Sequence, residues 1–385
     1  MKSWYINTFW VLLIIVILFC LSFTTSESIS NENAAFTFIS DDSLKVQVNE
    51  VLGTDGNILY YRSKFKTPVC ADKVCYEVEL NFYWNLLGDF VKYELLPGKP
   101  LTKDKHTSFS VDDYQKLSNV LANKYSSLGK LKKEELVMKV GRNDLDAVSG
   151  STVSSLKEQT IQGAIYSCYT LWHIANGIVI DSIRNRTVKQ LNKQVLSSII
   201  EMNSQDADYF LINNFTKENF KQYFPEIQFL IIRSTGYFAK NCIEKFPDDL
   251  LSTVEVQTFF GAQVDKLEHY AQMALFNKLQ NKIISTPLQV ALIGNMHNDK
   301  WKNSLIISLV CSSLNSIEDA TIHQMILKIV DEAIWVNQES LEKISAVAKN
   351  RVALKSDMQL MMQNYNNKSK IYLKTSGQAD FVPLK

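Results

Sequence analysis

The sequence predicts two domains of different class, an α+β domain followed by an all-α domain. Between residues 40 and 150, short stretches alternate apolar and polar residues with the period of two that is typical of half-buried strands. From about residue 188 to residue 370, apolar residues recur at helical spacing, and only three glycines and three prolines interrupt them. The chain has 385 residues, and single cores stop growing near ~250–300 residues, so more than one domain is expected.

Composition and charge exclude several classes of protein. Hydrophobic residues make up 46% of the chain and charged residues 21%, which is typical of a packed globular protein and not of a disordered one. The 41 Lys and Arg nearly balance the 40 Asp and Glu, for a net charge of +1. Because nucleic-acid binding depends on a concentrated positive field, we expect no nucleic-acid partner.

Residues 1–26 are predicted to be a signal peptide or an N-terminal membrane anchor. The stretch Phe9–Phe23 is almost wholly apolar, follows Met1-Lys2, and turns polar at Thr24. Its length lies between that of a signal core and that of a spanning helix, so both interpretations stay open, and we favour the anchor. The rest of the chain is then extracytoplasmic, in the periplasm or cell envelope, and anchored to the inner membrane. Residues 27–39 are polar and are interpreted as a linker.

The α+β domain is assigned to residues 40–185. Its first strands are predicted at residues 44–49 and 58–61, separated by a Gly-rich turn. The clearest strand, Tyr76–Trp84, has alternate apolar residues on one face, and Phe90–Leu95 is its hairpin partner. Ser110 with Asp113 predicts the start of a helix that runs to about Asn123. A single long helix over Ser154–Ala175, ended by Asn176-Gly177, closes the domain.

The all-α domain is assigned to residues 186–372, and residues 373–385 to a tail. Helix starts are indicated by Thr286 as N-cap before Pro287, and by Asn337 and Ser356. Successive short helices favour stacked helix pairs of the HEAT or a similar solenoid kind, although no residues repeat at a fixed period.

Cysteines and histidines indicate no metal site and no hydrolase. Cys70 and Cys75, with four residues between them, are interpreted as a disulfide in an oxidising compartment, with two free thiols as the alternative. Cys168, Cys242 and Cys311 stand apart, without His or Cys at ligand spacing. No residue is predicted to be catalytic.

One segment carries a candidate binding site. Residues 144–155 read Asp-Leu-Asp-Ala-Val-Ser-Gly-Ser-Thr-Val-Ser-Ser, at the entrance of the predicted long helix. The unpaired amides at a helix N-terminus favour a phosphate, and Gly150 allows close approach. The alternative is that one of the hydroxyl residues only caps the helix, and on these grounds alone the cap is favoured.

The order Asp146, Ser149, Gly150, Ser151, Thr152 resembles the signature of covalently flavinylated FMN-binding domains. This family includes the periplasmic flavin subunits of the sodium-pumping NADH:quinone oxidoreductase and of the Rnf complex. The resemblance covers about a dozen residues and does not reach the all-α domain. It implies that Thr152 carries FMN through a phosphodiester, and that an external flavin transferase recognises Asp146, Ser149 and Gly150. Ser151 stands where the family usually has Ala.

The resemblance implies an exported, membrane-anchored flavoprotein that passes electrons between extracytoplasmic redox partners, as a relay or as a reductase. Aromatic residues are candidates for the wall around the flavin ring, although aromatics on strands and helices are more often core. The candidates are Tyr83, Trp84, Tyr166, Tyr169 and Trp172. The alternative function is a non-redox envelope interaction protein whose helical-repeat domain binds a protein partner.

Overall fold

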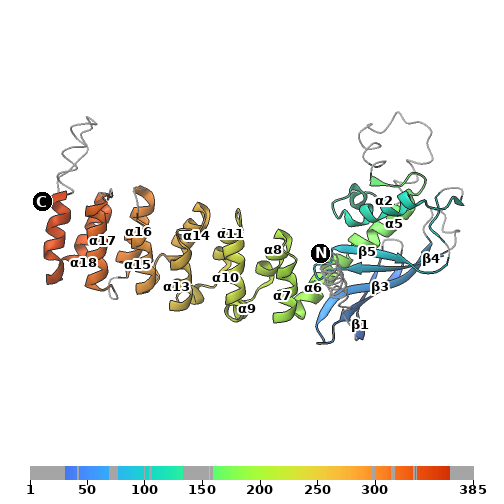
Figure 1. Cartoon of the computed structure of the whole chain (residues 1–385), viewed down its shortest axis with the longest axis horizontal. Coiled ribbons are helices and arrows are strands. Elements are labelled where there is room, and N and C mark those ends of the chain that lie inside the picture. The colour runs from blue at the N-terminus through green and yellow to red at the C-terminus, as the bar shows by residue number, and fades with distance from the viewer. Residues whose placement is uncertain are drawn as a thin grey trace, which may run out of the picture. The chain divides into compact units, whose positions relative to one another are not determined.

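The computed structural model describes residues 31–40, 43–68, 77–98, 100–103, 106–132, 156, 159–296, 300–313, 317–332, 334 and 336–364. The chain divides into two compact units, Met1–Phe210 and Leu211–Lys385. An α+β unit is therefore followed by a helical one, as the sequence predicts (Figure 1). The division falls after residue 210, however, and not after residue 185.

The first unit is built on a five-stranded antiparallel sheet in which neighbours in sequence are neighbours in space, in the order β1-β2-β3-β4-β5. The strands are β1 Asn31–Ile39, β2 Lys45–Leu52, β3 Ile58–Pro68, β4 Glu77–Trp84 and β5 Phe90–Leu95. Gly56 and Gly88 lie in the two tight turns, each with φ of 78°. Only glycine adopts this conformation without strain, so these two residues set where the hairpins turn.

Strand β1 corrects the prediction of a linker over residues 27–39. Its residues pair with β2 from Asn31 opposite Leu52 to Ile39 opposite Lys45. Residues 31–34 are exposed, and Phe38 is the one fully buried side chain of this strand. Phe36-Thr37-Phe38 does alternate, but this stretch is too short to indicate a strand after the polar residues that precede it.

The core of the first unit lies against the face of β4 that the sequence predicts. Val78, Leu80, Phe82 and Trp84 are all buried, and Phe82 packs edge-on against Phe65 with ring centroids 4.9 Å apart. The Trp84 Nε1 donates a hydrogen bond of 2.8 Å to the carbonyl of Ala175. The sheet is thereby tied to the helix that ends at Asn176.

Helices α2 (Val111–Ala122) and α5 (Ile165–Asn176) pack on each other. Helix α2 starts and ends as predicted, with a capping box formed by Ser110 and Asp113. Helix α5 ends at Asn176 as predicted, but it begins at Ile165 and not at Ser154. Gly163 has φ of 76° in the turn before it, and this left-handed conformation breaks the helix.

Helices α6 (Val179–Lys189) and α7 (Lys193–Glu201) belong to the first unit because they contact strands of the sheet, α6 on β1 and α7 on β3. Thr187 of α6 shares a hydrogen bond of 3.0 Å with the hydroxyl of Tyr61. The sequences of α6 and α7 have the same helical pattern as those of the later helices. The long-range contacts therefore place the boundary between the units within α8 (Gln205–Asn214).

The second unit is helical throughout its described residues (Figure 1). Its elements are α9 Lys217–Gln222, α10 Phe224–Arg233, α11 Phe238–Lys245, α12 Asp248–Leu251, α13 Val254–Gln263, α14 His269–Leu279, α15 Thr286–Gly294, α16 Lys300–Ser312, α17 Asp319–Asp331, α18 Gln338–Ala348, the short helix η3 Val352–Leu354 and a last helix over 355–364. Asn337 caps α18 as predicted, whereas Ser285, one residue before the predicted Thr286, is the N-cap of α15.

Alternate helices of this unit pack together in two layers. In one layer α11 contacts α14, α14 contacts α16, and α16 contacts α18. In the other, α13 contacts α15, α15 contacts α17, and α17 contacts η3 at the start of the last helix. Several hydrogen bonds between neighbouring helices of a layer join residues 32 to 35 positions apart, as in Lys328 to Gly294, Asn337 to Ser304 and Lys343 to Ser308. The bonds between α13 and the start of α15 join residues 26 and 28 positions apart.

None of the helices in the described part of the chain is long and apolar enough to cross a membrane. Residues 1–26, for which the sequence predicts a signal or an anchor, lie outside the described residues, as do residues 373–385.

Candidate functional site

The five residues of the predicted flavin site, Asp146, Ser149, Gly150, Ser151 and Thr152, lie outside the described residues. The same holds for Cys70 and Cys75. The structure does describe the chain on both sides of the segment 133–155, up to Lys132 and again at Leu156 and from Gln159 onward. The residues around Lys132, Leu156 and Gln159, which flank the segment, are called its foot.

Both sides of the foot are bound to the same part of the first unit. The Gln159 Oε1 accepts hydrogen bonds from the Ser126 hydroxyl at 2.8 Å and from the Ser127 backbone N–H at 2.8 Å. On the other side, the carbonyl of Leu131 accepts a hydrogen bond of 3.2 Å from the Tyr169 hydroxyl. The segment 133–155 therefore leaves and rejoins the unit beside α5.

The short helix η2 (Ser127–Lys130) holds the foot against α5. The Trp172 Nε1 donates to the carbonyl of Asn123 at 2.9 Å, and the His173 Nε2 lies 3.2 Å from the carbonyl oxygen of Leu128. A Cβ on Gly129 would lie 2.6 Å from the Cη2 of Trp172, so only glycine fits there without a shift. This close packing fixes the position of the foot.

The structure separates the five aromatic candidates for the flavin wall. Trp84, Tyr169 and Trp172 are 0%, 3% and 5% exposed, so they belong to the core. Tyr83 is half-buried on the opposite face of β4 from Trp84, and burial together with its hydrogen bond to Glu94 raises its pKa to about 12. Tyr166, the second residue of α5, is half-buried and also keeps accessible surface.

Tyr125 is a further aromatic residue at the foot, and sequence reasoning missed it. Its side chain is 81% exposed, directly before Ser126, and the Lys124 Nζ lies 5.5 Å from the centroid of its ring. Lys124 is itself held by Asp89 at 2.9 Å and by Asp206 at 2.8 Å. No local pattern predicts a functional role for Tyr125, because the residue is brought close to the foot only by the contact between the end of α2 and Gln159.

The foot also carries positive charge. Lys130 and Lys132 are both exposed at the side where the chain enters the segment 133–155. Two ammonium groups within three residues favour an anion nearby, and a phosphodiester is such an anion. Together with Tyr125 and Tyr166, they give the foot aromatic surface and a positive potential, which suit the ring and the phosphate of a nucleotide-like group.

Cys168, Cys242 and His323 have structural roles. Burial raises the pKa of the Cys168 thiol to about 11 and that of Cys242 to about 12, so these thiols are protonated at neutral pH. In the described ranges, no group of three or more His, Cys, Asp or Glu is placed to hold a metal ion. The His323 Nδ1 lies 2.7 Å from an Asp357 carboxylate oxygen, and this pair joins α17 to the last helix.

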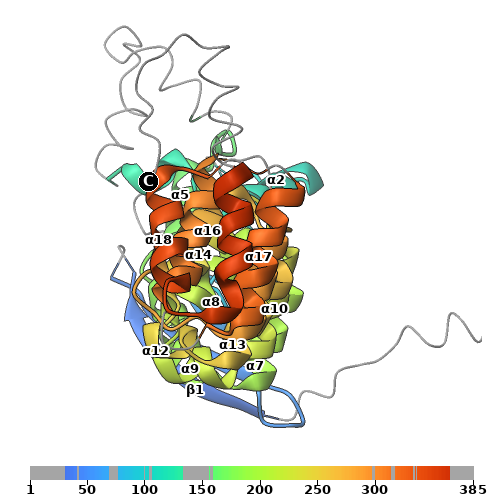
Figure 2. The same ribbon diagram turned by 90° about the vertical axis from the view of Figure 1, so that its left-hand side faces the viewer.

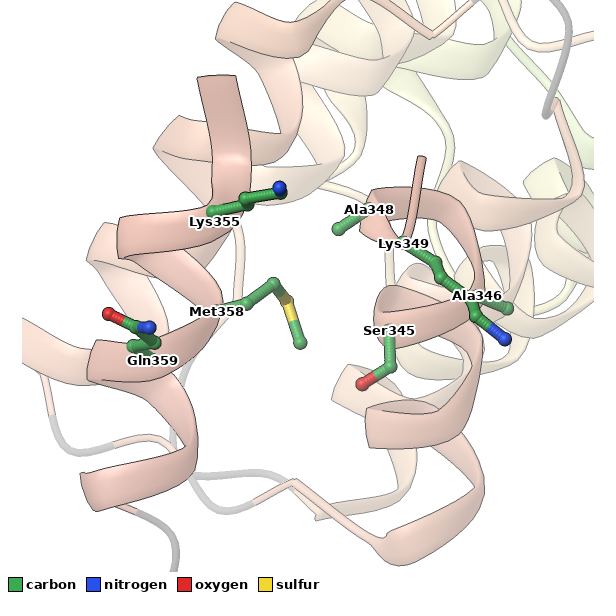
Figure 3. Close-up of a pocket in the computed structure, with 7 residues that line it drawn as sticks. All are labelled: Ser345, Ala346, Ala348, Lys349, Lys355, Met358 and Gln359. Carbon is green, nitrogen blue, oxygen red and sulfur yellow. The ribbon is translucent and has the colours of Figure 1, made fainter. Parts of the chain in front are cut away.

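The second unit contains a pocket of about 510 Å³ between α18 and the helix 355–364 (Figure 3). The residues that line it are Ser345, Ala346, Ala348 and Lys349 from α18, and Lys355, Met358 and Gln359 from the last helix.

Comparisons of the chain with protein-family models, with curated proteins and with solved structures find no match.

Proposed function

We propose that the protein is an exported flavoprotein that carries FMN covalently on Thr152 and transfers electrons between redox partners outside the cytoplasm. The observation that carries this proposal is the order Asp146, Ser149, Gly150, Ser151, Thr152, which resembles the flavinylation signature. A flavin transferase would attach the group by moving FMN from FAD to the Thr152 hydroxyl, releasing AMP. Residues 1–26 would anchor the protein to the inner membrane.

The foot supports this proposal because it limits where the flavin can reach. Thr152 precedes Leu156 by four residues, and four residues of fully extended chain span about 14 Å. Leu156 is buried beside Thr160, whose hydroxyl donates to the Leu156 carbonyl at 2.6 Å. A group on Thr152 is thus tethered close to the foot, where Tyr125 and Tyr166 offer aromatic surface.

FMN would supply the electron-transfer chemistry, and the chain would supply attachment, orientation and shielding. Thr152 needs only an accessible hydroxyl. Lys130 and Lys132 would offset the charge of the phosphodiester. Tyr125 and Tyr166 would stack against the ring and limit the access of water to one of its faces.

The test is the mass and fluorescence of the denatured protein. The full chain is expressed with a flavin transferase in an export-competent host, and we expect a mass gain of FMN less water on the peptide that contains Thr152. Thr152→Ala is expected to abolish the modification, whereas the matched variant Ser151→Ala, which introduces the usual residue of the family, is expected to retain it. A wild-type chain without flavin, or flavin on another residue, would contradict the proposal.

A second candidate function is protein binding by the helical unit, which we propose to be a solenoid of stacked helix pairs, of the HEAT or a similar kind. Two observations favour it. Several hydrogen bonds within its layers join residues 32 to 35 positions apart, which is the length of one helix pair. It also exposes an aromatic pair, Tyr237 and Tyr270, whose ring centroids are 5.1 Å apart and whose side chains are each 55% exposed. Exposed tyrosines are enriched at protein interfaces.

Site-specific photo-crosslinking in the native host tests the second function. A crosslinking residue in place of Tyr270 is expected to give one discrete adduct, which persists in the Thr152→Ala background. The exposed Asp331 serves as the control position. Equal crosslinking at both positions, or none at position 270, would count against a specific protein partner.

A further inference from the structure

The described part of the helical unit ends in a groove beside α18. Within the described layers, α14 lies between α11 and α16, and α16 lies between α14 and α18. Helix α18 contacts α16 on one side, and on another side it borders the pocket shared with the helix 355–364. Figure 2 faces this end of the unit, where α18 and the red helix beside it lie nearest to the viewer. The groove therefore occupies the place that one more helix of the stack would take.

The floor of the groove is apolar and adaptable. Ala346, Ala348 and Met358 line it, and Figure 3 shows Met358 and Ser345 pointing toward each other from the two helices. Small side chains allow a helix to approach closely, and the flexible thioether of methionine fits irregular apolar surfaces. A volume of about 510 Å³ has room for a few large apolar side chains.

The rim of the groove is positive. Lys349 and Lys355 line it, and neither forms an ion pair with a described residue. The neighbouring cations differ in this respect, because Lys343 pairs with Glu339 at 2.7 Å and Arg351 with Asp319 at 2.8 Å. Two lysines whose charge no described acid offsets favour an acidic occupant.

The chain's own C-terminal segment is a poor match for this rim. Residues 365–385 contain four lysines, at positions 368, 370, 374 and 385, against the single acid Asp380. Like charges would oppose the docking of this segment between Lys349 and Lys355. A helix with an apolar face and acidic flanks matches both the floor and the rim.

We propose that the groove between α18 and the helix 355–364 binds an amphipathic, acidic helix of a partner protein, in the place of the next helix of the stack. The inference rests on the protein-binding function proposed for the helical unit and does not depend on the flavin.

The experiment uses two designed peptides of about 18 residues, long enough to form a helix on binding. One has leucines on one helical face and glutamates on the other, and the matched peptide has lysines in place of the glutamates. Fluorescence anisotropy of each labelled peptide is titrated with the purified full chain. The acidic peptide is expected to bind at least about tenfold more tightly than the basic one, with a preference that weakens as salt increases.

Three variants locate the binding. Met358→Asp places a charge on the apolar floor and is expected to weaken the acidic peptide about tenfold or more. The double variant Lys349→Glu/Lys355→Glu is expected to reverse the preference between the two peptides. Lys245→Glu/Lys266→Glu makes the same change of net charge at two exposed lysines of the unit outside the pocket, and is expected to leave the preference unchanged.

Equal binding of the two peptides, or binding that Met358→Asp does not affect, would overturn the inference. A specific crosslink at position 270 would still support protein binding by the unit, so the two failures are distinguishable. Two further results would replace the partner helix with another occupant. Much tighter peptide binding by a chain that ends at residue 365 would identify the C-terminal segment, and a dimer that Met358→Asp dissociates would identify a second copy of the chain.

Discussion

The ion pair between Glu50 and Arg186 offers a direct test of the boundary between the two units. Glu50 of β2 is 5% exposed, and its carboxylate accepts hydrogen bonds from the Nε of Arg186 at 3.1 Å and from the Nη2 at 3.2 Å. The Gln190 Nε2 donates a third at 3.0 Å. Arg186→Met would keep much of the apolar stem but leave a buried carboxylate without its counter-charge.

The size of the effect follows from burial. Removing one partner of a fully buried ion pair costs about 3–5 kcal/mol. The Arg186 side chain is 35% exposed and the bond from Gln190 survives, so solvent screening reduces the expected cost to about 2–3 kcal/mol. Glu50→Gln/Arg186→Met carries no buried charge, and we expect it to recover about 1 kcal/mol or more of that loss.

Hydrogen exchange of the full chain, followed by mass spectrometry, measures this cost locally. In Arg186→Met, we expect the protected amides of β2 and α6 to exchange about 30- to 150-fold faster, which corresponds to about 2–3 kcal/mol. Amides of α17, in the second unit, serve as the internal control. A change below about threefold in β2, or a double variant that exchanges as fast as Arg186→Met, would show that this ion pair does not stabilise the unit as described.

Three further predictions concern packing and titration. Gly129→Ala is expected to destabilise the first unit by about 1–3 kcal/mol in chemical denaturation, because the added Cβ meets Trp172. The same change should destabilise a Trp172→Phe background by less. If the free-energy losses of the two substitutions simply add, the clash is not the cause. The Lys103 ammonium and the Ser110 N–H lower the pKa of Asp113 from 3.8 to about 2, so its stabilising contribution is present above pH ~4 and is lost as the pH falls toward 2. Asp113→Asn should therefore melt below wild type at pH 6 and together with it at pH 2, and a deficit that is independent of pH would contradict this. Burial raises the pKa of Cys242 to about 12, so a thiol reagent at pH 8 should label it only when the protein is denatured; rapid labelling of the native protein would show that the site opens.

Local signals predict those elements whose causes lie within a few residues. Strand β5 has the predicted bounds, and helix α2 begins at the predicted N-cap, because alternation and the capping box between Ser110 and Asp113 are local effects. The predicted start of α5 was wrong. Apolar residues keep helical spacing on both sides of Gly163, but the left-handed conformation of this glycine interrupts the helix. Strand β1 was missed because its alternating part, Phe36-Thr37-Phe38, is short, whereas its pairing with β2 extends back to Asn31.

The candidate site likewise has one part that the sequence predicts and another that depends on the fold. The order of residues from Asp146 to Thr152 is a local pattern, so the sequence can propose the attachment residue without a fold. The surroundings depend on contacts between distant residues. Gln159 meets Ser126 across 33 positions, and this contact makes Tyr125 a neighbour of the foot. Burial likewise removes Trp84 and Trp172 from the set of accessible aromatics.

Periodicity and capping act over one or two turns of chain, so they predict the order of the two classes of unit, the buried face of β4 and the capped ends of α2. Helix α6, in contrast, belongs with the sheet because of tertiary contacts such as that between Arg186 and Glu50, which are 136 residues apart. The bonds between helices of the second unit are long-range as well, and several join residues 32 to 35 positions apart. Such contacts depend on which surfaces meet after collapse, and no pattern within one or two turns of chain specifies them.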